Sequence, residues 1–145
     1  MDLKSLSLGA VLVLVACVLW LYFTHAIFGT GPVTIAIQIL AALLMLWARI
    51  TFGTRSFHAT ANPTAGGLVT TGPYRLMRHP IYAAILAFVW AGVAAHPSSL
   101  NMAAGLVASI ASFLRMIAEE RLLIATYPEY REYSEKTRRV IPFLL

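Results

Sequence analysis

Two long stretches of this chain contain no charged residue, and they constrain its fold more than any other feature. No Asp, Glu, Lys or Arg lies between Lys4 and Arg49, and none lies between Arg78 and Arg115. Only 12% of the 145 residues are charged and 59% are hydrophobic, whereas soluble domains have about 25% charged residues. The pattern predicts an integral-membrane protein with one domain over residues 1–145.

Each uncharged stretch is too long for a single crossing of the bilayer, which takes roughly 20 helical residues. Each is interrupted near its middle by residues that favour turns, FGTGP in the first and AHPSS in the second. The sequence therefore predicts an all-α membrane bundle with about four spans, the last two forming a helical hairpin. The third span is short and need not cross the bilayer fully. The predicted spans are 6–28, 33–49, 81–95 and 100–118.

Lys and Arg are absent from both turns and gather at the other ends of the spans, as Lys4, Arg49 and Arg78 illustrate. Cytoplasmic loops of membrane proteins are enriched in these residues. We therefore expect both termini, the loop 50–80 and a C-terminal cap at 119–145 to be cytoplasmic. The net charge of +5 then faces anionic membrane lipids. The basic residues form no extended soluble patch of the kind that binds nucleic acid.

Basic side chains stand directly before the third span, in the segment TTGPYRLMRHPIY. Pro80 suits the first turn of a helix, so Arg75, Arg78 and His79 lie at or before a helix N-terminus, and Tyr82 lies in the first turn. Such a helix start, with nearby arginines, attracts anions. Arginines at a membrane edge also bind lipid phosphates, and both roles stay open for Arg75 and Arg78.

Arg115 and Glu119 are four residues apart and share one helical face, while Glu120 points about 100° away. Charged groups at membrane depth are costly and are usually paired or functional. Either Arg115 and Glu119 form an ion pair that holds two helices together, or they belong to a polar pocket that meets the basic segment before the third span.

The four histidines show no spacing typical of metal ligands, and His25 and His96 belong to the turn ends of the spans. We therefore expect no metal site. The single cysteine, Cys17, lies in an apolar run and is interpreted as a small buried hydrophobic residue.

The chain after the fourth span is predicted to continue as a helix and to break near Pro128. Thr126 and Glu129 have the spacing of a capping box, which predicts a second helix that begins there. Tyrosines recur every three residues and would share a face: Tyr127, Tyr130 and Tyr133. They would form either an aromatic belt at the membrane interface or a lid over a cytoplasmic site.

Three segments of the second half resemble the C-terminal half of the isoprenylcysteine carboxyl methyltransferase family: GPYRLMRHPIY, EERLL and YPEYREYSEKTRRVIP. That family belongs with the membrane phospholipid methyltransferases and is more distantly related to sterol reductases. The resemblance covers roughly residues 67–143. The first two spans match only as generic apolar helices, and relatives often have five or more spans.

The resemblance implies an integral-membrane enzyme whose cofactor is S-adenosylmethionine, held at the cytoplasmic ends of the last helices under the C-terminal tail. It implies a catalytic role for Arg115, which would face a lipophilic substrate. The positions that match the family's cofactor site are Leu68, Val69, Tyr74, Arg78, His79, Pro80, Tyr82, Glu119 and Glu120.

The methyl acceptor is left open by these residues. A carboxylate acceptor is ionised at neutral pH and needs no base, and Arg115 could orient it by a bidentate hydrogen bond. An amine or thiol acceptor must lose a proton, for which His79 is a candidate base and a second catalytic residue. We expect O-methylation of an isoprenylcysteine-type carboxylate, with a phospholipid amine or small thiol as the alternative. A sterol-reductase-like NADPH enzyme and a non-catalytic membrane subunit are competing interpretations.

Overall fold

The computed structural model describes residues 3–53 and 67–141. Its long helices are α1 (Leu3–Phe23), α2 (Pro32–Phe52), α3 (Pro80–Ala95) and α4 (Ser99–Thr126), and its short ones are the 3-10 helix η2 (Gly72–Arg75) and α5 (Tyr130–Lys136). No strand occurs within the two described ranges, where Met77 and Arg138 form an isolated bridge. The predicted all-α fold is confirmed. Much of the predicted loop 50–80 and the last four residues of the predicted cap lie outside the described residues.

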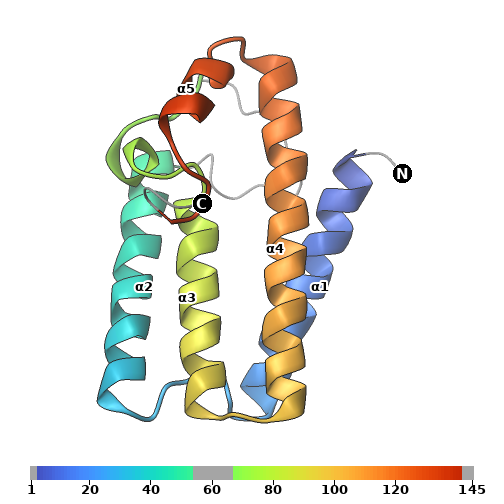
Figure 1. Ribbon diagram of the computed structural model, residues 1–145, viewed down its shortest axis with the longest axis vertical. Coiled ribbons are helices and arrows are strands. Elements are labelled where there is room, and N and C mark those ends of the chain that lie inside the picture. Colours follow the sequence, from blue (N-terminus) through green and yellow to red (C-terminus); the bar gives the residue numbers. More distant parts are fainter. Residues whose placement is uncertain (1–2, 54–66, 142–145) are drawn as a thin grey trace.

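The four long helices form two packed pairs. Helix α1 packs against α4 and α2 packs against α3, while contacts between α3 and α4 join the pairs. The α1–α2 and α3–α4 turns lie at one end of the bundle, and η2, α5 and the start of α3 lie at the other end (Figure 1). Both uncharged turns are thus separated from the basic segments by the length of the bundle. Which end faces the cytoplasm stays a prediction.

Three of the described helices, α1, α2 and α4, are long and apolar enough to cross a membrane. Helix α3 has 16 residues, so at 1.5 Å per residue it measures about 24 Å, less than a hydrocarbon core of roughly 30 Å. The predicted shortness of the third span is confirmed, and the number of crossings stays a prediction. Helix α4 continues past the predicted limit of 118 and ends only at Thr126.

Helix α1 ends at Phe23, earlier than the predicted boundary in the FGTGP turn. His25 takes a left-handed conformation with φ 56°. Its N–H donates to the Tyr22 carbonyl at 3.0 Å, and the Ala26 N–H donates to the Leu21 carbonyl at 2.7 Å. Together these bonds form a Schellman motif, which ends a helix by satisfying its last carbonyls. Glycine usually occupies this left-handed position, but here it is His25. The prediction relied on Gly and Pro as turn signals and therefore placed the end of α1 too late.

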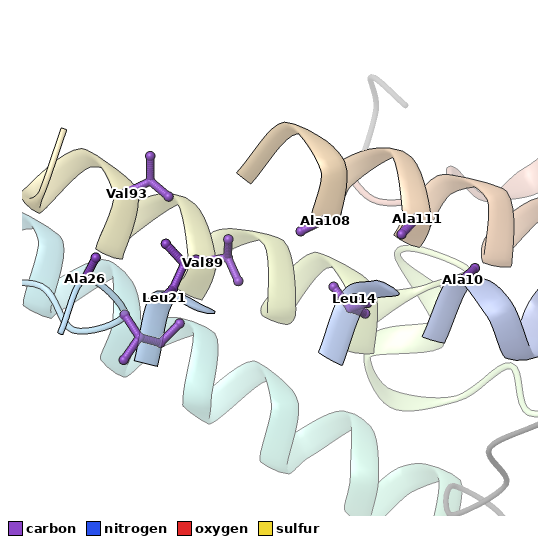
Figure 2. Close-up of a cluster of buried hydrophobic side chains, with 9 residues drawn as sticks. Ala10, Leu14, Leu21, Ala26, Val89, Val93, Ala108 and Ala111 are labelled. Atoms are coloured by element: carbon purple, nitrogen blue, oxygen red, sulfur yellow. The ribbon is translucent and has the colours of Figure 1, made fainter. Parts of the chain in front are cut away.

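Small side chains fill the interior of the bundle and large ones cover its outside. The buried core cluster joins α1, α3 and α4 with the turn after α1 (Figure 2); its members are Ala10, Leu14, Leu21, Ala26, Ile27, Val89, Val93, Ala108 and Ala111. In contrast, Leu12, Leu40 and Ile50 are 62%, 66% and 71% exposed. Association of helices in a membrane depends on close packing of small residues, since lipid solvates the large apolar ones. This distribution fits a bundle surrounded by lipid.

Candidate active site

The polar end of the bundle is shaped first by the turn at Gly72. Gly72 has φ +57°, and a Cβ atom at this position would lie 2.5 Å from Oγ1 of Thr51 in α2. Only glycine fits such a backbone. The turn leads into η2, where Tyr74 is buried with its ring centroid 5.4 Å from that of Phe52. The TTGPY segment therefore fixes Tyr74 against the end of α2.

Helix α3 begins at Pro80, with His79 as its N-cap residue, as the sequence predicted. His79 is 5% exposed and Tyr82 is 8% exposed. The His79 side chain reaches both acidic residues of α4, and the Tyr82 side chain reaches Glu119. The rings of His79 and Tyr82 lie edge to face with centroids 5.7 Å apart. The start of α3 thus supplies one wall of a polar cluster.

Glu119 is held at one of its two carboxylate oxygens. The Tyr82 hydroxyl donates to Oε1 of Glu119 at 2.7 Å, and Nε of Arg115 donates to the same oxygen at 2.9 Å. Arg115 Nε also donates to the Tyr82 hydroxyl. The second oxygen, Oε2, lies 3.7 Å from Nδ1 of His79, and the Glu119 side chain is 22% exposed. Arg115 and Glu119 therefore form both an ion pair within α4 and a link to α3.

Glu120 has a different and more enclosed environment. Its Oε1 accepts from Nε of Arg78 at 2.9 Å and lies 3.2 Å from Nε2 of His79. Its Oε2 accepts from Nε and Nη2 of Arg139 at 3.0 and 2.9 Å. The Glu120 side chain is 10% exposed. Two arginines and a histidine thus surround this carboxylate, and His79 stands between Glu119 and Glu120.

The two arginines of the basic segment have separate roles. Arg78 points inward: besides Glu120, its Nη1 donates to the backbone carbonyls of Ser134 and Thr137, and its side chain is 11% exposed. Arg75 is an exposed residue of η2. Arg78 therefore binds protein groups and does not point toward lipid phosphates. For Arg75, binding of a lipid phosphate stays open.

A C-terminal strap, which we define as residues 137–141, crosses the start of α3. The N–H of Arg78 donates to the Arg138 carbonyl at 2.7 Å, and the N–H of His79 donates to the Arg139 carbonyl at 2.9 Å. The Arg139 guanidinium lies 5.7 Å from the ring centroid of Phe113 in α4. Arg139 is not among the predicted site residues, although it lies in the segment YPEYREYSEKTRRVIP, which carries part of the family resemblance.

The tyrosines of the C-terminal segment turn inward. Tyr130 is 2% exposed, and the Tyr133 hydroxyl donates to the Tyr74 carbonyl at 2.6 Å. Burial raises the pKa of Tyr133 to about 12. The predicted capping box is wrong: Thr126 is the last residue of α4, its hydroxyl donates to the Leu122 carbonyl, and α5 begins only at Tyr130. These contacts favour a cover over the polar cluster rather than a belt of exposed rings.

The structure brings most of the predicted site residues together. Six surround the two carboxylates or provide them: Arg78, His79, Tyr82, Arg115, Glu119 and Glu120. Pro80 opens the helix that carries His79. Leu68 and Val69 are half-buried and precede the Gly72 turn. Burial, the nearby Tyr133 and Glu119 raise the pKa of Tyr74.

An apolar groove of about 370 Å³ runs between α1 and α4 and is open to the outside of the bundle. Its lining includes Gly9 and Val13 of α1 and Ile110 and Leu114 of α4. Arg115 follows Leu114, and its Nη1 lies 3.5 Å from the carbonyl of Ser7 in α1. The Arg115 guanidinium therefore joins Glu119 to α1, one residue after Leu114 of the groove.

Within the described ranges, no group of three or more His, Cys, Asp or Glu side chains is arranged to hold a metal ion. What the cluster offers is a partly exposed carboxylate for a cation and a buried guanidinium on the residue that follows Leu114 of the apolar groove. Such a site can hold two ligands of different character next to each other.

Comparisons with known proteins agree with the resemblance. The family model described as phospholipid methyltransferase matches residues 26–130, more than half of the chain. No solved structure matches.

Two curated relatives match over 79 residues, 53% of this chain. The cobalt-zinc-cadmium resistance protein CzcN of Cupriavidus metallidurans is 37% identical, and the match covers 36% of that protein. The nickel-cobalt-cadmium resistance protein NccN of Alcaligenes xylosoxydans xylosoxydans is 34% identical, with 37% of it covered. The chain thus corresponds to little more than a third of the length of these relatives.

Proposed function

Because the chain belongs to the phospholipid methyltransferase family, we propose that it is a membrane methyltransferase that uses S-adenosylmethionine and acts on a lipophilic acceptor. The observation that carries the proposal is the partly exposed Glu119 carboxylate, with Oε1 fixed by Tyr82 and Arg115 and with Oε2 3.7 Å from Nδ1 of His79. A carboxylate in this state suits a ligand that carries positive charge.

The residues around Glu119 fit the proposed cofactor by their chemistry. When bound, S-adenosylmethionine supplies an electrophilic methyl group on a sulfonium cation. Glu119 would bind a cationic part of the cofactor, and Tyr74, Leu68 and Val69 would bound its less polar part. Because Tyr82 and Arg115 hold Glu119 in advance, little conformational entropy is lost when a cation binds, which favours affinity.

Arg115 is proposed to orient the acceptor. Its buried guanidinium bonds to Glu119 and to the Ser7 carbonyl of α1, and the preceding residue, Leu114, lines the apolar groove. An amphiphile in the groove would then present an anionic group to Arg115. A charge-assisted hydrogen bond from arginine fixes both the distance and the orientation of such a group. Alignment of donor and acceptor is the main contribution that a methyltransferase must make, because it replaces an encounter of two molecules by a prearranged pair.

Two acceptor classes carry an anionic group beside an apolar chain. An isoprenylcysteine-type carboxylate is itself the nucleophile and needs no base. A phospholipid would place its phosphate near Arg115 and its amine at the methyl donor, and the family's description favours this second candidate. The amine would have to lose a proton, for which His79, placed between Glu119 and Glu120, is the candidate base.

The test is methyl transfer by the purified full-length chain in lipid nanodiscs. The protein is incubated with S-adenosylmethionine labelled in its methyl group and a total lipid extract, and the labelled product is identified. We expect label in the lipid fraction, as an alkali-labile ester for a carboxylate acceptor and as a stable N-methyl group for a phospholipid. Absence of label from every lipid, together with no binding of the cofactor, would contradict the proposal.

A further inference from the structure

Adjacent acidic residues in the site have contacts so different that they cannot share one task. Both oxygens of Glu120 are bonded to protein cations, whereas Oε2 of Glu119 lies 3.7 Å from Nδ1 of His79. The side chain of Glu120 is 10% exposed and that of Glu119 is 22% exposed. A further cation at Glu120 would have to displace Arg78 or Arg139, at a high cost for buried pairs.

Glu120 and its partners come from three separate parts of the chain. Arg78 and His79 precede α3, Arg139 belongs to the C-terminal strap, and Glu120 itself lies in α4. Arg78 also donates to the carbonyls of Ser134 and Thr137, on either side of the end of α5. Glu120 therefore bonds both to the start of α3, through Arg78 and His79, and to the strap, through Arg139.

Besides the bond from Arg139 to Glu120, the strap is joined to the start of α3 by a small set of hydrogen bonds. Two backbone hydrogen bonds join it to Arg78 and His79, and these are the residues whose side chains Glu120 holds. The Arg139 side chain is 40% exposed, so the bond from Arg139 is the one that water reaches most easily. Loss of the Glu120 charge would free the Arg139 side chain. It would also remove the Glu120 contacts that hold Arg78 and His79, whose N–H groups bind the strap.

From this geometry we propose that Glu120 is a positioning residue, which fastens the C-terminal strap over the start of α3 and orients His79, while Glu119 alone offers a carboxylate to the cofactor. The inference rests on the proposed function in taking the Glu119 side of the cluster as the cofactor site. The attachment of the strap by Glu120 depends only on the contacts within the chain.

The two backbone bonds of the strap provide a direct measurement. The amide hydrogens of Arg78 and His79 are protected by the carbonyls of Arg138 and Arg139, so their exchange with deuterium reports release of the strap. In the full-length protein in nanodiscs without cofactor, Glu120→Gln should speed exchange in this segment about tenfold or more, the size expected for lost charge-assisted hydrogen bonds. Glu119→Gln should leave this exchange close to that of the wild type.

Matched controls separate fastening from general destabilisation. Glu132→Gln makes the same chemical change at a surface pair with Lys136, where Glu132 is 72% exposed, and should change nothing at Arg78 and His79. Arg139→Gln should reproduce the effect of Glu120→Gln, and Arg139→Lys should restore part of the protection by keeping the charge. If Glu120→Gln is too unstable to purify, Arg139→Gln at its exposed position carries the same test.

Cofactor affinity then distinguishes the two acids. The dissociation constant of S-adenosylhomocysteine should rise in Glu119→Gln without faster exchange at Arg78 and His79, and should rise in Glu120→Gln only together with faster exchange. Unchanged exchange in both Glu120→Gln and Arg139→Gln would overturn the inference and leave the proposed function intact. Failure of the wild type to bind cofactor would instead contradict the proposed function and leave the exchange result valid.

Discussion

The hydroxyl of Tyr82 in α3 donates a hydrogen bond of 2.7 Å to Oε1 of Glu119 in α4. This bond joins two helices at the point where the apolar part of the bundle ends, and Arg115 contacts both partners. The carboxylate is thereby held in one orientation before any ligand arrives. Several consequences can be measured.

Tyr82→Phe removes this hydroxyl and leaves the ring in place. Glu119 would retain Arg115 but lose its fixed orientation, and Arg115 would lose an acceptor. We expect a loss of roughly 1–3 kcal/mol in stability, as for other buried polar groups left without a partner, together with weaker cofactor binding. Thermal unfolding in detergent and calorimetry with S-adenosylhomocysteine provide the two readouts. An unchanged affinity would show that orientation of Glu119 is irrelevant to binding.

Arg115→Ala should reduce turnover more than it reduces cofactor affinity, because the guanidinium is proposed to orient the acceptor. With Tyr82 still bonded to Glu119, the turnover number should fall about tenfold or more. The matched control is Arg131→Ala, at an exposed position of α5, which should behave as wild type. If Arg115→Ala instead lost cofactor affinity but kept its turnover number at saturating cofactor, Arg115 would contact the cofactor and not the acceptor, which would contradict the proposal.

Gly72→Ala should destabilise the fold, because φ is +57° and the new methyl group would lie 2.5 Å from Oγ1 of Thr51. Backbone strain of this kind costs on the order of 1–3 kcal/mol. Gly9→Ala is the control: a Cβ atom there has nothing within 4 Å, and alanine favours a helix. Thermal unfolding should therefore shift down for Gly72→Ala only, and equal shifts for both variants would contradict the assigned strain.

Tyr133 should make stability depend on pH in alkaline solution. Burial raises its pKa to about 12 from about 10 in the unfolded chain, so the folded state favours the neutral phenol. The contribution of Tyr133 is complete below pH 10 and is lost as the pH rises from about 10 to 12. Urea unfolding at pH 9, 10 and 11 should show a shallower decline for Tyr133→Phe than for wild type; parallel declines would rule out this contribution.

Much of the fold follows from the placement of charges. The uncharged stretches, each with one turn, predicted four helices with the polar segments at one end, and the structure has this arrangement. The helix ends were less predictable. His25 in the left-handed conformation ended α1 early, because hydrogen bonds that satisfy the last carbonyls can form without glycine. Thr126 had the spacing of a cap but remained within α4.

Most members of the polar cluster could be predicted from the sequence, but the partners of its two glutamates could not. The Arg115–Glu119 pair follows from helical spacing, and the placement of Tyr82 follows from Pro80. The sequence does not reveal which of two neighbouring glutamates faces the cations of the C-terminal strap. That depends on the rotation of α4 about its axis, which is set by packing of small residues against α1 and α3. Arg139 was not predicted as a site residue, because its partner Glu120 lies in α4, far from the strap in sequence.

The most direct test of the account is calorimetric titration of the purified chain with S-adenosylmethionine and S-adenosylhomocysteine, for wild type and Glu119→Gln, with Glu132→Gln as the control. We predict that wild type and Glu132→Gln bind each ligand with the same dissociation constant. In Glu119→Gln this constant should be at least about tenfold higher, as expected for loss of a charged partner. Normal binding by Glu119→Gln, or no binding by wild type, would contradict the assignment of Glu119 as the residue that holds the methyl donor.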